Sequence, residues 1–587
     1  MINFIAKIRL NDHPNNQKIS IYKKLYSKDI EVEVLKYSDN LVEIHHTGTK
    51  DNLFIKYIGE DKYLSFAEIS LNDRNRILEH IAEKGLQNVS DSNLLMELYL
   101  RYGQKGFKVI LDGFIFFLVD YKNKKTIVFR DHIGLKSFFY LKNKSSLFIS
   151  TSFKQLTLID NLKLSINSAK MLDFLNINDK SKSSTFINEI KKIPTNMCFS
   201  FTSHSILKNT YFNFEINNLR KSENEQIELL KKKLFSSVTL KNKIDANKVG
   251  FMFSGGLDSS AILSIFRYFN KSNQKLYSYT ASFTNFDGSS SKLIDEEEYQ
   301  KEITKLEDIN DRSFDGMEET TLSEIDFYLD LVGQPFFFPN LYISKNVFVL
   351  AKKDDVRYVL NGNDGDTVIS HGYEFLLELF FRLRWISLYK EISNISSKRK
   401  LSKKFIFRRL IINQIFDTDY NIFSAKKRHR DSLTTNLHPN AIEVASMVSN
   451  YYGINEIYPF YNKDLMELCI NISPSLKIRN GYARYILRQA TKGITPDKIR
   501  MRLTKSDLGH ALCRNFVNHD TEIIEDSLEN PDPKLLNFID IKKMRSNWKD
   551  MKNDQRSFVS RSNFPIRLFS FVVLNRWLKN WRSLEVK

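Results

Sequence analysis

Cysteine is scarce in this chain: its 587 residues include only Cys198, Cys469 and Cys513. The three are isolated and odd in number, which argues against a disulfide framework and against a zinc site built from cysteine. We expect them to be buried apolar residues. No cysteine precedes Cys198, so residues 1–197 contain no thiol that could act as a nucleophile.

Long hydrophobic runs are missing as well. The run from Phe114 to Val119 is far too short to span a membrane, and the segment around Lys7 and Arg9 lacks the apolar stretch of a signal peptide. Internal repeats and low-complexity tails are also missing. We therefore expect a cytoplasmic protein with no membrane partner.

Acidic residues are outnumbered, with 69 Asp and Glu against 88 Lys and Arg, which gives a formal net charge of +19. This excess favours acidic partners through long-range attraction. Much of it falls within residues 398–430, where no nucleic-acid-binding module is recognisable. We expect either a solvated basic face or a dock for an acidic peptide or partner protein, and no specific nucleic acid.

What is present is a phosphate-binding pattern. An apolar run ends in Ser254-Gly255-Gly256-Leu257-Asp258-Ser259, after which apolar residues recur at helical spacing. Two glycines at the start of a helix let several backbone N–H groups face an anion. The stretch lacks the Gly-Lys-Ser/Thr of a Walker loop and resembles the pyrophosphate loop of ATP-pyrophosphatases. We expect Ser254, Gly255, Gly256, Asp258 and Ser259 to bind ATP, the alternative being an ordinary glycine-rich turn.

The secondary-structure pattern divides the chain into two domains and predicts an α/β protein. Residues 1–214 alternate short β-like runs with turns, which predicts a strand-rich domain of two sheets. Residues 221–587 alternate strands with helices and then become mostly helical, which predicts a doubly wound parallel sheet with a helical C-terminal part. The strands expected in the first domain are Val32–Leu35, Leu53–Tyr57, Val109–Leu111, Phe114–Asp120, Thr126–Phe129, Ser137–Leu141 and Leu147–Ser150.

Several segments resemble the asparagine synthetase family. Leu111-Asp112-Gly113-Phe114 and Arg130-Asp131-His132-Ile133-Gly134 resemble its Ntn-hydrolase-like amidotransferase domain, and Ser254–Ser259 with Tyr482-Ala483-Arg484 and Ile486-Leu487-Arg488 resemble its synthetase domain. The resemblance implies an ATP-dependent carbon–nitrogen ligase that adenylates a carboxylate and joins it to an amine. The family's glutaminase uses an N-terminal cysteine, whereas this sequence begins Met1-Ile2-Asn3. We therefore expect no glutaminase activity and a structural or docking role for the first domain.

The resemblance also suggests roles for single residues. Asp258 and Asp366 would hold Mg²⁺, which usually takes one or two protein carboxylates, although Asp366 could instead cap a helix. Lys505 would be the catalytic cation that balances the adenylation transition state, the alternative being a solvated lysine. Asp364, Arg502 and His371 are candidate supporting residues, and a structural role for His371 is the simpler interpretation. Asp295, Glu296 and Glu298 either touch metal or substrate, or complement a helix dipole.

The substrate is left open by the sequence. Asn363 stands three positions before Asp366, where asparagine synthetases carry Glu and β-lactam synthetases carry Tyr, and an amide cannot act as a base. This departure favours a relative that uses another amine, such as a lasso peptide cyclase or β-lactam synthetase of natural product biosynthesis. The substrate would then be a precursor peptide or a small amino acid that bears a carboxylate and an amine. The alternatives are an asparagine synthetase that uses free ammonia, a non-catalytic ATP-binding scaffold, and an enzyme that adenylates a nucleobase.

Overall fold

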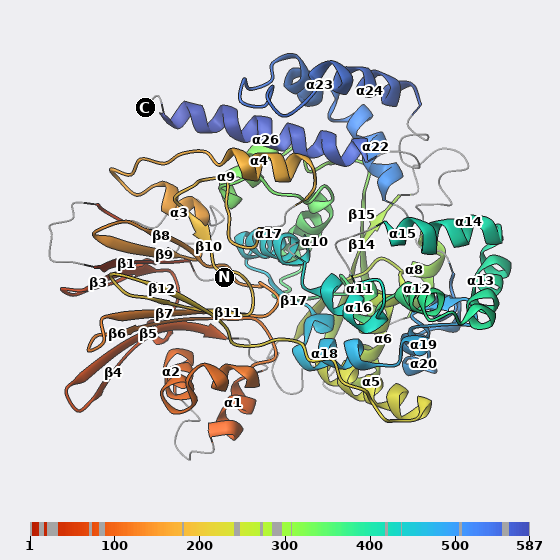
Figure 1. Cartoon of the computed structure of the whole chain (residues 1–587), viewed down its shortest axis with the longest axis horizontal. Helices are drawn as coiled ribbons and strands as arrows, with labels where there is room; N and C mark the ends of the chain where they lie inside the picture. Colours follow the sequence, from red (N-terminus) through yellow and green to blue (C-terminus); the bar gives the residue numbers. More distant parts are fainter. Residues whose placement is uncertain are drawn as a thin grey trace.

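Two six-stranded antiparallel sheets lie face to face at one end of the computed structural model (Figure 1). The structure describes residues 3–10, 17–19, 33–69, 73–81, 89–178, 181–239, 247–270, 274–283, 296–306, 308–416, 421–435, 437–503, 508–554 and 563–585. The strand orders are β10-β8-β9-β1-β3-β2 and β12-β11-β7-β6-β5-β4. The two sheets, together with the helices and loops of residues 1–214 that pack on them, are called the sandwich below. The strands are β1 (Phe4–Arg9), β2 (Leu35–Ser38), β3 (Val42–His46), β4 (Leu53–Ile58), β5 (Asp61–Ile69), β6 (Phe114–Asp120), β7 (Lys125–Arg130), β8 (Phe139–Lys142), β9 (Ser146–Ser150), β10 (Lys191–Lys192), β11 (Met197–Phe201) and β12 (Ile206–Thr210).

The apolar run in β6 follows from burial on both faces of its sheet. Side chains alternate between the two faces of a strand. Ile115 and Phe117 therefore point between the sheets, where they join Phe4 of the other sheet. Phe116 and Leu118 point outward, into the core beneath α1 (Arg74–Ile81) and α2 (Asp91–Tyr102). The outer face of the first sheet is covered in the same way, by α3 (Phe153–Thr157) and α4 (Ser168–Leu175).

A five-stranded parallel sheet follows the sandwich, with the order β15-β14-β13-β16-β17. From β13 the chain continues to β14 and β15 on one side of β13, and it then adds β16 and β17 on the other side. Parallel sheets of this kind bind ligands outside the carboxyl ends of the strands, at the point where the order reverses. That point lies between β13 and β16. The strands are β13 (Lys248–Met252), β14 (Lys275–Ser282), β15 (Ile309–Asp315), β16 (Tyr358–Asn361) and β17 (Asn455–Ile457).

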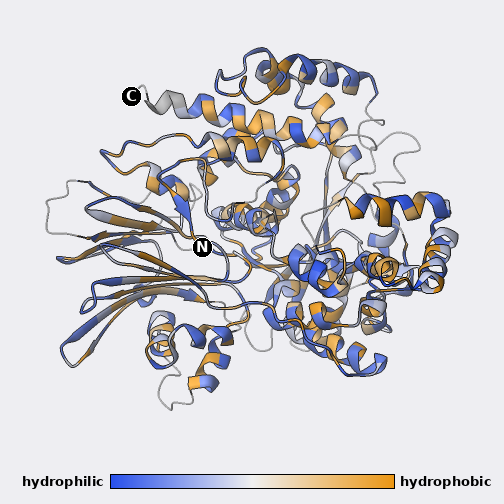
Figure 2. Ribbon diagram, viewed as in Figure 1, coloured by the Kyte–Doolittle hydropathy of each residue, from blue (hydrophilic) through white to orange (hydrophobic). Residues whose placement is uncertain are grey.

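Helices make up most of the remaining chain, as the sequence predicted. In Figure 2 hydrophobic residues recur along α26, which packs against α4 of the sandwich. None of the described helices is long and apolar enough to cross a membrane. The longer helices are α5 (Glu223–Val238), α6 (Leu257–Phe269), α8 (Glu297–Thr304), α9 (Ile325–Val332), α10 (Leu341–Lys353), α12 (Tyr373–Phe381), α13 (Trp385–Arg399), α16 (Ala425–Leu433), α17 (Leu437–Tyr451), α18 (Lys463–Asn471), α20 (Tyr485–Ala490), α22 (Gly509–Asn518), α23 (Thr521–Glu529), α24 (Ile541–Asn553) and α26 (Phe564–Glu585).

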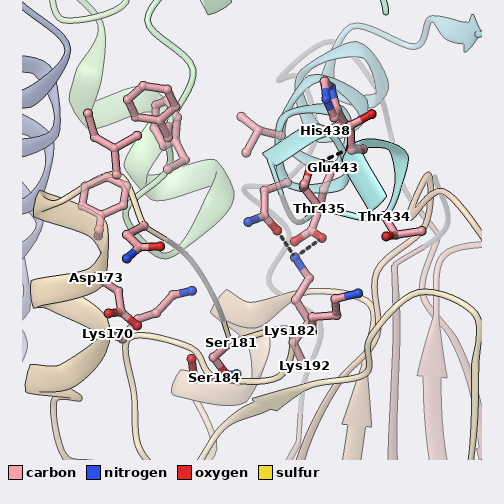
Figure 3. Close-up of a pocket in the computed structure, with 18 of the residues that line it drawn as sticks. Lys170, Asp173, Ser181, Lys182, Ser184, Lys192, Thr434, Thr435, His438 and Glu443 are labelled. Carbon is pink, nitrogen blue, oxygen red and sulfur yellow. Dashed lines mark hydrogen bonds and ion pairs between the residues drawn. The ribbon is translucent and has the colours of Figure 1, made fainter. Parts of the chain in front are cut away.

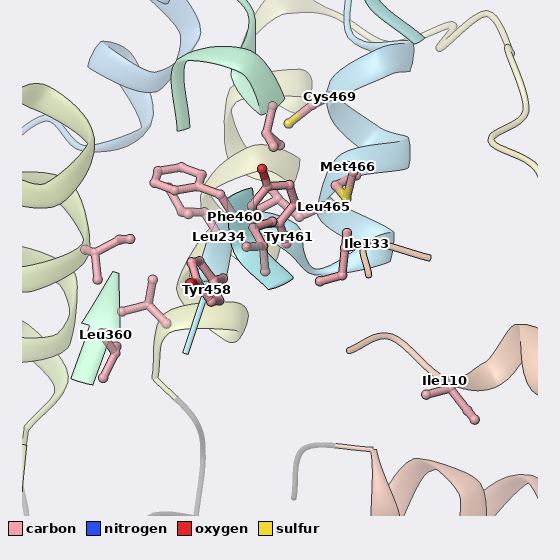
Figure 4. Close-up of a cluster of buried hydrophobic side chains, with 14 of the residues drawn as sticks. Ile110, Ile133, Leu234, Leu360, Tyr458, Phe460, Tyr461, Leu465, Met466 and Cys469 are labelled. Atoms are coloured by element: carbon pink, nitrogen blue, oxygen red, sulfur yellow. The ribbon is translucent and has the colours of Figure 1, made fainter. Parts of the chain in front are cut away.

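A continuous hydrophobic core and a buried ion pair join the sandwich to the parallel-sheet part. Figure 4 shows Ile110 and Ile133 of the sandwich with Tyr458, Phe460 and other residues of the cluster to which they all belong. Beside this cluster Nη2 of Arg130 lies 2.9 Å from Oε2 of Glu443 in α17, and both side chains are buried. The family-like segment that begins at Arg130 therefore forms part of the contact between the two parts.

The structure corrects two strand predictions. Val109–Leu111 is not a strand, because η3 (Gly103–Val109) is a 3₁₀ helix that runs into this segment. The backbone N–H groups of Leu111 and Asp112 donate to the carboxylate of Asp73, at 2.7 and 2.8 Å, instead of to a neighbouring strand. The strand expected at Val32–Leu35 begins only at Leu35, and Val32 lies outside the described residues.

Candidate active site

The predicted phosphate loop connects β13 to the N-terminus of α6. Gly255 has a φ of +79°, and a Cβ there would lie 3.0 Å from the Gln300 side chain, so the position favours glycine. Oγ of Ser254 lies 3.1 Å from Oγ of Ser259 and accepts a hydrogen bond of 3.2 Å from the N–H of Gly256. The loop therefore presents backbone donors and two hydroxyl groups at a helix N-terminus, an arrangement that stabilises phosphate.

A second glycine-rich loop follows β16 and packs against the first. A Cβ on Gly362 would lie 2.7 Å from Cα of Ser259, and one on Gly365 would lie 2.7 Å from Cγ of Asp258. Only glycine permits this close approach. Asp364 adopts a left-handed conformation at the N-cap of α11 (Gly365–Ile369), and Asp366 lies in the first turn of that helix. Asp366 is therefore not the helix cap that the sequence left open.

The two loops border a cavity of about 300 Å³, called the nucleotide cavity below. Arg484, Arg488 and Arg502 line it, which places three cationic side chains around the same space. Arg484 forms an ion pair with Asp258. Arg502 lies 2.8 Å from Glu296 and stacks 4.0 Å above the ring of Tyr299. These fixed cations complement a polyanion such as a triphosphate.

The other side of the nucleotide cavity is largely apolar. Ala281 and Phe283 come from β14 and the residue that follows it, and Ile343 and Val347 come from α10. Leu508 adds a further apolar group. An apolar slot beside a cluster of polar groups is the usual composition of a small-molecule site, and here it suits a planar base.

The two aspartates predicted to hold Mg²⁺ face the same cavity, one from each loop. No cluster of three or more His, Cys, Asp or Glu groups suited to a metal occurs among the described residues. Mg²⁺ usually takes one or two carboxylates and fills its other positions with water and phosphate oxygens. Asp258 and Asp366 therefore fit a Mg²⁺ ion that arrives with ATP, where it would supply positive charge to the phosphates.

A larger cavity of about 810 Å³ lies between the sandwich and the parallel-sheet part, and we call it the interdomain cavity (Figure 3). Its sandwich wall carries the lysines Lys170, Lys182 and Lys192, and Phe336 and Phe337 lie among the other lining residues. Burial lowers the pKa of Lys192 to about 8. Asp366 lines both this cavity and the nucleotide cavity. The two cavities therefore adjoin at the second loop.

The structure places some of the other predicted site residues in or beside the site and others away from it. Lys505 and Asp295 lie outside the described residues. Nε2 of His371 lies 3.5 Å from Oδ2 of Asp366, so this histidine lies beside the second loop. Glu296 contacts Arg502 inside the nucleotide cavity, whereas Glu298 is exposed and lies 2.7 Å from Lys498. Of the acidic residues expected at the start of α8, the structure therefore brings Glu296 into the site and leaves Glu298 outside it.

Two side chains in the site were not singled out from the sequence. Arg484 was noted only as part of a family-like segment; it is the N-cap of α20, with a left-handed φ of +52° that no local pattern predicts. His438 lines the interdomain cavity, and its Nδ1 lies 3.0 Å from Oδ1 of Asp364. No local pattern marks His438, because its partner is distant in sequence.

The fold and the site define an α/β protein with a nucleotide-type cavity at the reversal point of a doubly wound sheet. A family model described as asparagine synthase matches residues 230–579, and one described as a glutamine amidotransferase domain matches residues 74–212. The first match spans more than half of the chain, so the chain belongs to the asparagine synthase family. This confirms the family expected from the sequence, whose members are ATP-dependent ligases that form amide bonds.

The chain is similar in sequence to known and putative asparagine synthetases over about 70% of its length. Asparagine synthetase [glutamine-hydrolyzing] 1 of Bacillus subtilis is 22% identical over 470 residues, which are 70% of this chain and 70% of that protein. A putative asparagine synthetase of Methanocaldococcus jannaschii is 24% identical over 432 residues, which are 71% of this chain and 78% of that protein. Among solved structures, glutamine phosphoribosylpyrophosphate amidotransferase from B. subtilis is similar with a TM-score of 0.22 and 11% identity, over 42% of this chain and 53% of that one.

Proposed function

We propose that this protein adenylates a carboxylate in the nucleotide cavity and transfers the acyl group to an amine in the interdomain cavity. The carboxylate oxygen attacks the α-phosphorus of ATP and displaces pyrophosphate, and the amine then attacks the acyl carbon and displaces AMP. The observation that carries the proposal is the position of Asp366 between a cavity lined by three arginines and a larger cavity beside it.

The residues of the first loop have separable tasks in this scheme. The N–H groups at Gly255 and Gly256, with the hydroxyls of Ser254 and Ser259, hold the departing pyrophosphate at the N-terminus of α6. Arg484 offsets the negative charge that grows on the α-phosphoryl group, and Lys505 keeps this role as a second candidate. Mg²⁺ held by Asp258 and Asp366 would add charge compensation.

The size of the interdomain cavity supports a peptide as substrate. Pockets of roughly 300–1,000 Å³ hold drug-sized ligands, and about 810 Å³ is more than one amino acid fills. Its lysines and aromatic rings suit a segment with acidic and apolar side chains. The reaction we favour is ring closure on such a peptide, as in lasso peptide cyclases of natural product biosynthesis. The basic surface of residues 398–430 is proposed to receive an acidic peptide or partner protein.

A second candidate is asparagine synthesis from aspartate and free ammonia. It is supported by the similarity to the asparagine synthetases of B. subtilis and M. jannaschii. A non-catalytic ATP-binding scaffold is the third candidate, and the intact loop from Ser254 to Ser259 speaks against it.

The test is to incubate the protein with ATP and Mg²⁺ and to measure AMP and pyrophosphate. One arm contains aspartate and ammonium, and the other a pool of linear peptides with a free N-terminal amine and one internal aspartate or glutamate. We expect AMP and pyrophosphate in the peptide arm, with a product lighter than its peptide by one water. Product only with aspartate would support the asparagine synthetase alternative, and no AMP in either arm would contradict a ligase.

A further inference from the structure

His438 lies in the wall between the two cavities of the proposed reaction. It belongs to the first turn of α17 and lines the interdomain cavity, where Figure 3 shows it near Thr434 and Thr435. Its side chain is only 21% exposed. Its partner Asp364 lines the nucleotide cavity. The imidazole is therefore hydrogen-bonded to the loop that borders the nucleotide cavity, where the acyl-adenylate would form. The same side chain lines the interdomain cavity, which would hold the amine.

The contacts of His438 fix its orientation and its tautomer. Nδ1 lies 3.0 Å from Oδ1 of Asp364, and an ionised carboxylate can only accept hydrogen bonds. The proton of the neutral ring must therefore be on Nδ1, which leaves Nε2 as the atom that can take up a proton. The other carboxylate oxygen of Asp364 accepts a hydrogen bond from the hydroxyl of Tyr461, a buried residue. A histidine oriented by a carboxylate that is itself held in place is the usual arrangement of a general base.

The chemistry needs such a group, because an amine must lose a proton when it becomes an amide. Three of the acidic groups that line the interdomain cavity are already engaged. Glu443 forms an ion pair with Arg130, and Asp431 lies 2.8 Å from Arg430. Glu374 accepts a hydrogen bond from Ser370.

We propose that His438 is the general base of amide formation and that Asp364 is its positioning residue; this inference rests on the proposed ligase function. As the amine nitrogen attacks the acyl carbon, the C–N bond forms and the bond from that carbon to the AMP oxygen breaks. AMP leaves with the electron pair, and the proton of the amine passes to Nε2 of His438 and then to solvent. Burial opposes a charged ring, but the hydrogen bond to Asp364 outweighs it, so the pKa of His438 lies above its ordinary value.

The experiment separates base catalysis from adenylation by comparing two nucleophiles. Hydroxylamine is largely unprotonated at neutral pH and is so strong a nucleophile that it traps an acyl-adenylate without an enzymic base, releasing its proton to water. An ordinary amine is a weaker nucleophile toward the same acyl group and depends on a base to take its proton. The N-acetylated form of the most active peptide of the pool is incubated with hydroxylamine, and the unblocked peptide is allowed to form its own amide. The variants are His438→Gln and Asp364→Asn, and the control is His204→Gln in the exposed turn after β11.

For His438→Gln we expect the rate of hydroxamate formation to stay within about twofold of the parent and amide formation to fall at least about a hundredfold, the usual range for loss of a general base. Asp364→Asn should lower the ratio of amide to hydroxamate by about tenfold or more, because its amide group can reverse the tautomer. His204→Gln should change neither. An equal loss in both reactions, or unchanged amide formation, would overturn the assignment of His438. Failure of the parent to form any hydroxamate would instead contradict the proposed ligase function.

Discussion

Asp258 and Arg484 form an ion pair between the phosphate loop and α20, although 226 residues separate them in the sequence. Both side chains are largely buried, at 16% and 9% exposed. A carboxylate that would bind Mg²⁺ thus already faces a cation in the nucleotide cavity. Loss of either charge should therefore impair catalysis.

Removing the charge of Asp258 should abolish pyrophosphate formation without unfolding the protein. Asp258→Asn is nearly isosteric, so packing changes little, but the metal loses a ligand. We expect the rate of pyrophosphate release at saturating Mg²⁺ to fall by orders of magnitude, while the protein stays folded with a lower melting temperature, because the buried guanidinium of Arg484 loses its partner. Asp308→Asn, at an exposed site that pairs with Arg267, is the control. Pyrophosphate release at the parent rate would show that Asp258 does not hold the metal.

A cation at the α-phosphoryl group should act on kcat more than on the KM for ATP. Because negative charge grows there in the transition state, we expect Arg484→Met to lower kcat at least about a hundredfold, the effect of losing one preorganised electrostatic group. Lys505→Met tests the candidate from the sequence in the same assay, with the same expected result. Lys492→Met, at an exposed position, is the control. A variant that changes only KM would identify a binding residue, and an unchanged kcat would remove that cation from the chemistry.

Glu456 should make the stability of the fold depend on pH. Burial raises the pKa of this carboxyl, which accepts a hydrogen bond of 2.6 Å from Asn361, from 4.5 to about 7. Between these values the folded chain binds a proton that the unfolded chain lacks, so this contribution to stability falls as pH rises. At pH 8 the cost is about 3 kcal/mol, from 1.36 kcal/mol per pKa unit.

Glu456→Gln keeps the side chain neutral at every pH. We expect a higher melting temperature than the parent at pH 8 and nearly the same melting temperature at pH 5. Glu60→Gln, in an exposed turn, should show no such difference. A change in melting temperature that is the same at both pH values would contradict the shifted pKa of Glu456.

Glutamine should not serve as a nitrogen source. The three cysteines are buried, and burial raises the pKa of both Cys198 and Cys469 to about 12, which keeps these thiols protonated. We expect no ammonia release from glutamine by the purified protein and no stimulation of AMP formation by glutamine. Turnover of glutamine by the full chain would refute this prediction.

The parts of the site that the sequence predicted are those set by local backbone geometry. Gly255 and the residues around it define a strand, loop and helix within a few positions, and the loop ending in Asp366 does the same. The parallel, doubly wound type of the second sheet also followed, because strands that alternate with helices favour it. The strand expected at Val109–Leu111 was wrong because a distant side chain, Asp73, takes its backbone donors.

The parts that could not be predicted depend on contacts between distant segments. The pairing of Arg484 with Asp258 and that of His438 with Asp364 arise only when α20 and α17 pack beside the two loops. The interdomain cavity likewise needs walls from both parts of the chain, including Lys170 and Asp366. No periodicity or spacing in one segment carries this information.

Attack of a carboxylate on the α-phosphorus of ATP leaves an isotopic signature in AMP. The most active peptide of the pool, or aspartate if only that substrate reacts, is labelled with ¹⁸O in its carboxylate and incubated with ATP and Mg²⁺, and the products are analysed by mass spectrometry. We expect one ¹⁸O atom in AMP and none in pyrophosphate. Label in inorganic phosphate together with ADP would contradict it, because the carboxylate would then have attacked the γ-phosphorus.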